Sequence, residues 1–198
     1  MTLLLSIILI IMIIFIIAKF FVDFDLLNLV CIESEVDGNK YCIRERKNSE
    51  EADNAVDALA NATQNCKKLI KHLAEKRKDD EITIRLIKGF NPKRIQETLP
   101  DSDLVAYSEN KGEKLAFCLN TKKNGQKMID ENTLMFVVLH ELSHIACDEV
   151  GHTPKFWRIF KELLIESFKI GIYKPVDYKK NPKNYCGMTI SDNPYFDL

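Results

Sequence analysis

The chain has 198 residues, which is enough for one ordinary domain with a short extension. Basic and acidic residues nearly cancel, so the formal net charge at pH 7 is only −1. This balance excludes a general electrostatic field that would attract nucleic acid or an anionic surface, and we expect no nucleic-acid partner.

The chain begins with an uncharged apolar run, Thr2 to Ala18, and apolar residues continue after Lys19 as far as Val22. A membrane-spanning helix needs about 20 mostly apolar residues, whereas the apolar segment of a secretory signal peptide has only about 7–15. The run therefore predicts a single-pass N-terminal transmembrane anchor over residues 1–22, with residues 2–22 in a lipid bilayer. The membrane would be a viral or organelle membrane, and the orientation stays open because Lys19 is the single nearby basic residue.

Residues 23–198 are predicted to form the second part of the chain, a folded domain. Its first element is a pair of short strands around the turn Asp37-Gly38-Asn39. Cys31 and Cys42 could face each other across this hairpin, although buried free thiols fit the sequence equally well. The absence of a C-x-x-C pair among the six cysteines argues against a zinc ribbon or a thioredoxin-type site.

The middle of the domain combines helix and strand signals. Ser49 is expected to cap a long helix with an apolar stripe, and residues 79–92 fit either a strand or a helix that ends at Gly89. Two strands are predicted at Leu104–Ser108 and Lys114–Leu119. The second of these is expected to be the edge strand that a peptide substrate joins through main-chain hydrogen bonds.

Two further helices and an extended tail complete the domain. Asp130 is expected to cap a helix that runs to about Cys147, and Thr153-Pro154 begins the next helix, since proline suits the first helical position. From about residue 173 the sequence predicts an extended tail. Its residues Tyr173, Tyr178 and Tyr185 could stabilise a negatively charged oxygen in a reaction, although packing is the better-supported role.

The helix that begins after Asp130 carries ionisable residues inside an apolar run. His140 and His144 are four residues apart and so project from the same side of the helix, and Glu141 borders that face. Unpaired ionisable groups are costly in an apolar interior, and a bound divalent cation removes this cost for the two imidazoles. The sequence His140-Glu141-Leu142-Ser143-His144 is the H-E-x-x-H pattern of zinc proteases, so Zn²⁺ is the expected cofactor.

A catalytic zinc ion takes three protein ligands and keeps a fourth position for water. His152 is the preferred third ligand, because Gly151 permits a sharp reversal after the helix. Asp148 and Glu149 would replace it if the turn is tighter, and Glu162 or Glu166 would replace it if a glutamate on the next helix binds the metal. Cys147 is expected to be a core residue.

The sequence "HELSH" followed by "GHTPKFWRIF" resembles the WLM and SprT-like families of small zinc metallopeptidases. The likeness covers roughly Val30 to Tyr195, with a longer spacing from His144 to His152 than in many WLM sequences. It is similar in style to the membrane-tethered WLM-like proteins of large DNA viruses. This resemblance implies that His140, His144 and His152 bind zinc and that Glu141 is the catalytic acid and base.

The predicted fold class is therefore α+β, a minimal zincin-like metallopeptidase domain whose active-site helix packs on a small antiparallel sheet behind one transmembrane helix. The predicted function is hydrolysis of peptide bonds in a protein or peptide substrate by zinc-activated water, with Glu141 as general base and acid. The alternative is a structural protein of a membrane or virion, such as a minor capsid protein, that retains the zinc site without proteolysis. Assembly with other membrane or capsid proteins would fit this alternative.

Overall fold

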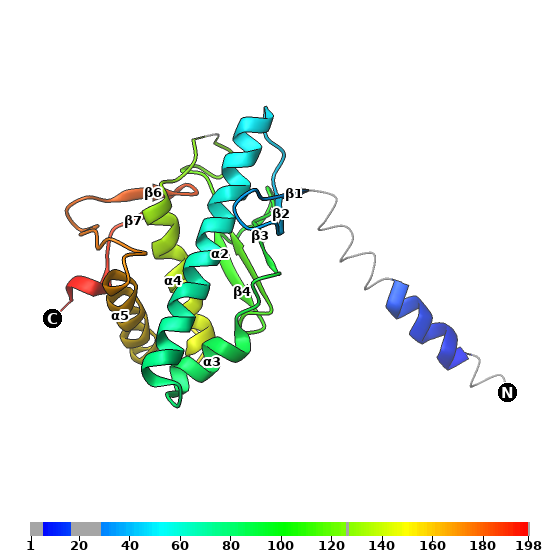
Figure 1. Cartoon of the computed structure of the whole chain (residues 1–198). Coiled ribbons are helices and arrows are strands. Elements are labelled where there is room, and N and C mark those ends of the chain that lie inside the picture. Colours follow the sequence, from blue (N-terminus) through cyan, green and yellow to red (C-terminus); the bar gives the residue numbers. More distant parts are fainter. Residues whose placement is uncertain (1–5, 17–28, 126, 198) are drawn as a thin grey trace.

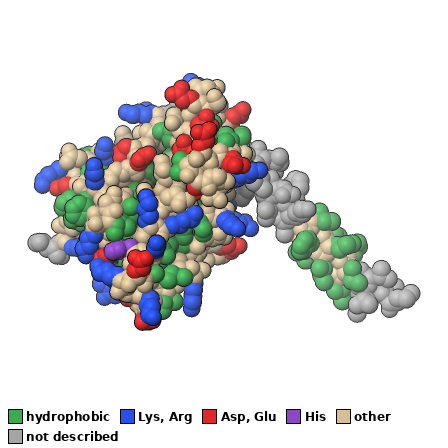
Figure 2. All heavy atoms as spheres, in the orientation of Figure 1, with side chains coloured by type: hydrophobic (Ala, Val, Ile, Leu, Met, Phe, Trp, Pro, Cys, Tyr) green, Lys and Arg blue, Asp and Glu red, His purple; other side chains and the backbone are tan. Residues whose placement is uncertain are grey.

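The structure is a computed structural model that describes residues 6–16, 29–125 and 127–197. Residues 6–16 form a helix whose apolar side chains are exposed (Figure 2). At about 1.5 Å per residue these described residues reach roughly 16 Å, whereas the hydrocarbon core of a bilayer is roughly 30 Å thick. Residues 2–5 and 17–22 of the predicted anchor, and the predicted boundary at residue 23, lie outside the described residues.

No helix in the described part of the chain is long and apolar enough to cross a membrane. The prediction of a single-pass anchor is therefore wrong, together with the bilayer contact and the membrane localisation that depended on it. The length of the apolar run in the sequence set that expectation.

A mixed sheet forms one layer of the domain (Figure 1). Its strands are β1 (Val30–Glu33), β2 (Lys40–Ile43), β3 (Ile95–Glu97), β4 (Ala106–Glu109) and β5 (Lys114–Phe117). Within the described residues they lie in the order β1-β2-β3-β5-β4. The β1–β2 and β4–β5 pairs are antiparallel, whereas β2–β3 and β3–β5 are parallel. The expected antiparallel sheet is thus wrong, because the helical connection from β2 to β3 returns the chain in the same direction.

Four α-helices of the described chain belong to this domain. They are α2 (Ser49–Arg77), α3 (Glu81–Gly89), α4 (Glu131–Ala146) and α5 (Pro154–Lys169). The ambiguous segment is a helix, α3, whose N-cap Asp80 accepts a hydrogen bond from the Thr83 amide. The predicted cap Asp130 and the predicted helix start at Thr153-Pro154 are confirmed, whereas Asn48 caps α2 in place of the predicted Ser49.

Helix α4 lies in the middle of the domain, as Figure 1 shows. It contacts α2, α3 and α5 as well as β4 and β5, while α2 covers the β1–β3 side of the sheet. Residues on nearly every side of α4 are therefore buried. A helix that is apolar all round belongs in such a position, which agrees with the sequence of this segment.

The C-terminal tail is less extended than the sequence predicts. It contains a hairpin of β6 (Lys183–Tyr185) and β7 (Met188–Ile190), followed by the short helix η1 (Pro194–Phe196). A disulfide between Cys118 and Cys186 joins this hairpin to the chain that follows β5. The disulfide between Cys31 and Cys42 connects residues directly opposite each other in β1 and β2. Of the two possibilities left open by the sequence, the facing pair is the one that forms.

An ionic cluster around Glu166 connects α5 to α2. The Glu166 carboxylate accepts hydrogen bonds from Lys76 Nζ at 2.9 Å, from Lys169 Nζ at 2.9 Å and from His72 Nε2 at 2.9 Å. Burial by itself would raise the pKa of this carboxyl, but the hydrogen bonds from Lys169, Lys76 and His72 outweigh burial and lower the pKa to about 2. The ionised carboxylate therefore stabilises the packing of α5 against α2.

We expect Glu166→Gln to lower the free energy of unfolding at pH 7 by about 1–3 kcal/mol, because the substitution removes a mostly buried charge from its partners. Because the pKa in the folded state lies below the ordinary value, this stabilisation is complete above about pH 4.5 and is lost as the pH falls towards 2. Urea unfolding of both proteins between pH 7 and pH 2 measures the difference. An equal difference at both ends of this range would contradict the account.

Candidate metal centre

Three imidazole rings converge at the surface end of α4. His140 and His144 lie one helical turn apart, and their Nε2 atoms are 3.3 Å from each other. His152 follows α4 in a loop, and its Nε2 atom is 2.9 Å from Nε2 of His140. Gly151 precedes it with a φ of +83°, so the predicted reversal at this glycine is confirmed.

The donor atoms fit a tetrahedral metal ion. Zinc binds imidazole nitrogen at about 2.0–2.1 Å, so two nitrogens on one tetrahedral zinc ion lie roughly 3.3–3.4 Å apart. The Nε2 separations of 2.9 and 3.3 Å are close to this value, and one donor atom from each of the three histidines lies within 4.8 Å of the others. Hydrogen bonds among three imidazoles that point at one centre cannot satisfy all of them, whereas a shared cation can.

Burial keeps the two helical imidazoles neutral. Loss of hydration, reinforced by the neighbouring histidines, lowers the pKa of His140 to about 3. Burial, together with His152 and Lys111, lowers the pKa of His144 to about 4. A neutral imidazole offers a nitrogen lone pair, which is the form that binds a metal ion.

Glu141 lies beside the three histidines with its carboxyl group unpaired. Its residue surface is 5 % exposed, and it makes no hydrogen bond or ion pair with any residue in the described ranges. Burial raises the pKa of this carboxyl to about 7. Glu141 also lines the two cavities that flank the histidines, so a molecule bound there can reach it.

Aromatic rings of α5 hold the imidazoles in place. The Phe156 ring stacks on the His144 ring with centroids 4.3 Å apart, and the Phe160 ring meets the His140 ring edge-on at 5.2 Å. The His152 ring also packs on the Trp157 ring, with centroids 5.6 Å apart. His152 therefore contacts this tryptophan and lies beside His140 at the same time. Thr153 and Pro154 start α5, and Phe156 and Phe160, which pack on the imidazole rings, therefore lie in the first two turns of this helix.

Lys111 is a supporting residue that the sequence analysis missed. Its ammonium group donates hydrogen bonds to the carbonyl oxygens of His144, Cys147 and Glu149 at 3.1, 2.7 and 2.9 Å. It therefore caps the C-terminal end of α4 and fixes the start of the loop that carries His152. The sequence alone places Lys111 in a turn between two strands and does not show what its side chain contacts. In the structure Asn110, Lys111 and Gly112 all adopt positive φ in this turn between β4 and β5.

Three of the residues considered as alternative third ligands form ion pairs elsewhere. Asp148 forms an ion pair with Lys155 at 2.6 Å, Glu162 pairs with Arg77, and Glu166 belongs to the cluster with α2. Cys147 is fully buried as expected for a core residue. The group that could hold a metal ion within the described residues contains the three histidines and excludes Glu149.

Two cavities form a cleft along the edge of the sheet. One has a volume of about 570 Å³ and the other about 510 Å³, and both are lined by Ala106, His140, Glu141 and His152. The edge strand beside the histidines is β4, since β5 is paired on both sides by β3 and β4. The prediction that the strand at Lys114–Leu119 is the edge is therefore wrong, because the chain turns back and adds β4 outside it.

The three candidate tyrosines are buried. Tyr173 accepts a hydrogen bond from the Asn193 side chain, and the Tyr178 ring packs edge-on against Phe136. Tyr185 alone lines the larger cavity among these three, but its hydroxyl donates to the carbonyl oxygen of Val105 at 3.1 Å. Burial raises the pKa of each hydroxyl, and the contacts of all three are those of packing residues.

Comparison with known proteins agrees with this geometry. The model of the WLM domain family matches residues 42–194. Protein R325 of Acanthamoeba polyphaga mimivirus is 40% identical over 99 residues, which is 50% of each chain. Protein 136R of Invertebrate iridescent virus 6 is 44% identical over 82 residues, which is 41% of this chain and 44% of the relative. The chain thus spans about half the length of the curated relatives it matches.

A solved structure, Wss1 from Saccharomyces cerevisiae, is 20% identical, with a TM-score of 0.45 over 65% of this chain and 86% of that chain. The family match covers most of the present chain, and the chain belongs to the WLM domain family, a zinc metallopeptidase-like family. The resemblance to the WLM family, deduced from the histidine motif and the sequence that follows it, is thereby confirmed.

We expect the purified chain to bind one zinc ion, and His140→Ala, His144→Ala or His152→Ala to weaken binding by more than about 100-fold. The loss of a residue that merely supports a ligand already costs about 10–100-fold. Competition with a chromophoric chelator measures the affinity. His72→Ala is the matched control, because it removes a histidine that pairs with Glu166 away from the centre. Equal affinity for all four variants would contradict the assignment of these ligands.

Proposed function

We propose that this chain is a zinc-dependent metallopeptidase in which His140, His144 and His152 hold the metal ion and Glu141 transfers protons. The observation that carries the proposal is the convergence of three imidazole nitrogens beside a buried, unpaired carboxyl group in an open cleft. The family of the chain supports the same reaction class.

The bound zinc ion would act as a Lewis acid that activates water and polarises the carbonyl group to be cleaved. Glu141 makes no competing hydrogen bond to a described residue, so its carboxylate is available to accept a proton from the attacking water. The same carboxyl group then donates a proton to the leaving amine. Phe156 and Phe160 hold the imidazole rings in the orientation that this reaction requires.

The substrate would be a protein or peptide segment that binds in extended form along β4. The Cys118 amide donates to the Val105 carbonyl, and hydrogen-bonded pairs alternate along an antiparallel ladder. The backbone groups of Ala106 and Ser108 therefore point away from β5, towards the open edge. A peptide can add to this edge through main-chain hydrogen bonds, and Ala106 is shared by both cavities at the metal centre.

We expect Glu141→Gln to lower peptide hydrolysis by about 10²- to 10⁴-fold, since the amide cannot accept and return a proton. The affinity for zinc should remain within about threefold, because Glu141 is not a ligand. Turnover of a fluorogenic peptide pool and zinc content measure the two effects. If the chain is instead a structural protein without proteolytic activity, neither the unmodified chain nor the variant should hydrolyse the peptides. Full activity of the variant would exclude Glu141 as the acid and base.

Ala106→Pro tests the proposed role of β4. Proline removes the outward N–H but is tolerated at a sheet edge, so the fold and the zinc content should persist. We expect kcat/KM to fall by about 3- to 10-fold, which corresponds to the loss of one hydrogen bond. Ala106→Val is the matched control, because it adds similar bulk and keeps the N–H. Equal losses in the two variants would argue against peptide addition to this strand.

A further inference from the structure

The larger cavity beside the metal centre has predominantly apolar walls. Phe136 and Val137 of α4 and Trp157 and Phe160 of α5 line one side, next to His140. Its volume of about 570 Å³ lies within the range of pockets that bind small organic groups, about 300–1,000 Å³. The cavity could therefore enclose one large side chain of a bound peptide.

The C-terminal segment forms a large part of the remaining wall. The lining residues of this segment are Tyr185, Met188, Thr189, Ile190, Ser191, Asp192, Pro194 and Asp197. Its two acidic residues, Asp192 and Asp197, pair with Lys179 at 3.1 and 3.3 Å. The acidic groups at this wall are thus partly neutralised, and the aliphatic side chains of Met188 and Ile190 decide the character of the cavity.

The hairpin that carries this wall is fixed at its turn. Cys186 and Gly187 have φ values of +49° and +86°, as in a tight two-residue hairpin turn. A cysteine rarely adopts this conformation, so the surrounding contacts must hold it there. The Cys186 amide donates to the Asn120 carbonyl at 2.8 Å and the Gly187 amide donates to the Thr121 carbonyl at 3.0 Å.

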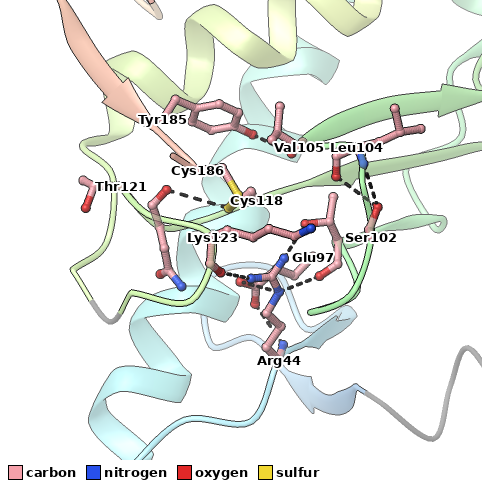
Figure 3. The surroundings of a disulfide bond; sticks show 12 residues. Arg44, Glu97, Ser102, Leu104, Val105, Cys118, Thr121, Lys123, Tyr185 and Cys186 are labelled. Atoms are coloured by element: carbon pink, nitrogen blue, oxygen red, sulfur yellow. Dashed lines mark hydrogen bonds and ion pairs between the residues drawn. A yellow bond between two sulfur atoms is a disulfide. The ribbon is translucent and has the colours of Figure 1, made fainter. Parts of the chain in front are cut away.

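The disulfide joins the same turn to the sheet. Figure 3 shows the bond between Cys186 and Cys118, with the Tyr185 hydroxyl directed at Val105 just before β4. The buried Arg44 side chain donates a hydrogen bond to the Lys123 carbonyl at 2.6 Å. It thereby fixes the loop whose carbonyl oxygens accept hydrogen bonds from the amides of the hairpin turn. Strand β4, which would receive the substrate, and the cavity wall are therefore attached to each other.

We propose that the β6–β7 hairpin is the specificity-determining wall of this site, and that the substrates are peptides with a large apolar side chain next to the cleaved bond. This inference rests on the proposed peptidase function. A leucine, methionine or phenylalanine in the cavity removes apolar surface from water against Phe136, Ile190 and Met188. Full burial of such a side chain favours binding by about 10- to 100-fold over glycine, and aspartate would bind more weakly still.

The test digests a pool of peptides, randomised at successive positions, with the zinc-loaded full chain, and identifies the products by mass spectrometry. We expect large apolar residues at one position beside the cleaved bond, with an enrichment over glycine of about 10- to 100-fold. Met188→Asp should reduce this enrichment at least fivefold, because it places a carboxylate in the wall. Val36→Asp makes the same kind of change at an exposed residue in the β1–β2 turn and is the matched control.

The double variant Cys118→Ser/Cys186→Ser should also reduce the enrichment, since it detaches the wall from the sheet. Cys31→Ser/Cys42→Ser removes the other disulfide and should keep the preference. Even if the disulfide variant does not fold, the half-exposed Met188 provides an independent test. A flat preference in the unmodified chain, or an equal preference in Met188→Asp, would overturn the inference.

A binding measurement separates this inference from the proposed function. Fluorescence anisotropy of the full-length Glu141→Gln chain is measured with labelled peptides that differ by phenylalanine, glycine or aspartate at one position. Tighter binding of the phenylalanine peptide by the predicted factor, without hydrolysis by the unmodified chain, would support the apolar site and refute the peptidase. Equal affinities for the three peptides would refute the apolar site whether or not hydrolysis occurs.

Discussion

Convergence of three imidazole nitrogens on one point is the constraint on which the site depends. Two of them belong to α4, whose apolar residues place it in the middle of the domain, and their half-buried rings remain neutral. Neutral nitrogens at 2.9 and 3.3 Å form a stable arrangement when a cation shares their lone pairs. Phe156 holds the His144 ring, Lys111 caps the end of α4, and Gly151 allows the reversal of the chain before His152.

The parts of the cleft come from distant segments of the chain. Helix α4 carries Glu141, β4 supplies an open strand edge, and the C-terminal hairpin forms an apolar wall. The disulfide between Cys118 and Cys186 joins the hairpin to the chain that follows β5, and the hydrogen bond from Tyr185 to Val105 joins it to the start of β4. In the proposed mechanism, metal binding and proton transfer both depend on α4, whereas substrate recognition uses β4 and the hairpin. Substitutions in the strand or the hairpin can therefore be separated from those at the metal.

Much of the candidate metal centre could be predicted from the sequence because its signals are local. The spacing of His140 and His144 identifies one face of a helix, Asp130 marks its start, and Gly151 marks the reversal that brings in the third histidine. The same local evidence placed α5 through Thr153 and proline. These elements depend on neighbours within a few residues, and the structure agrees with each of them.

The missed features depend on contacts across the chain. Strand order places β4 outside β5, and the disulfide of the hairpin joins cysteines 68 residues apart, so neither follows from periodicity. The predicted anchor rested on hydropathy alone, and no described helix is long and apolar enough to cross a membrane. X-ray absorption at the zinc edge of the loaded chain tests the central claim most directly. Three imidazole nitrogens at about 2.0–2.1 Å are predicted, and sulfur ligands or fewer than three imidazoles would contradict it.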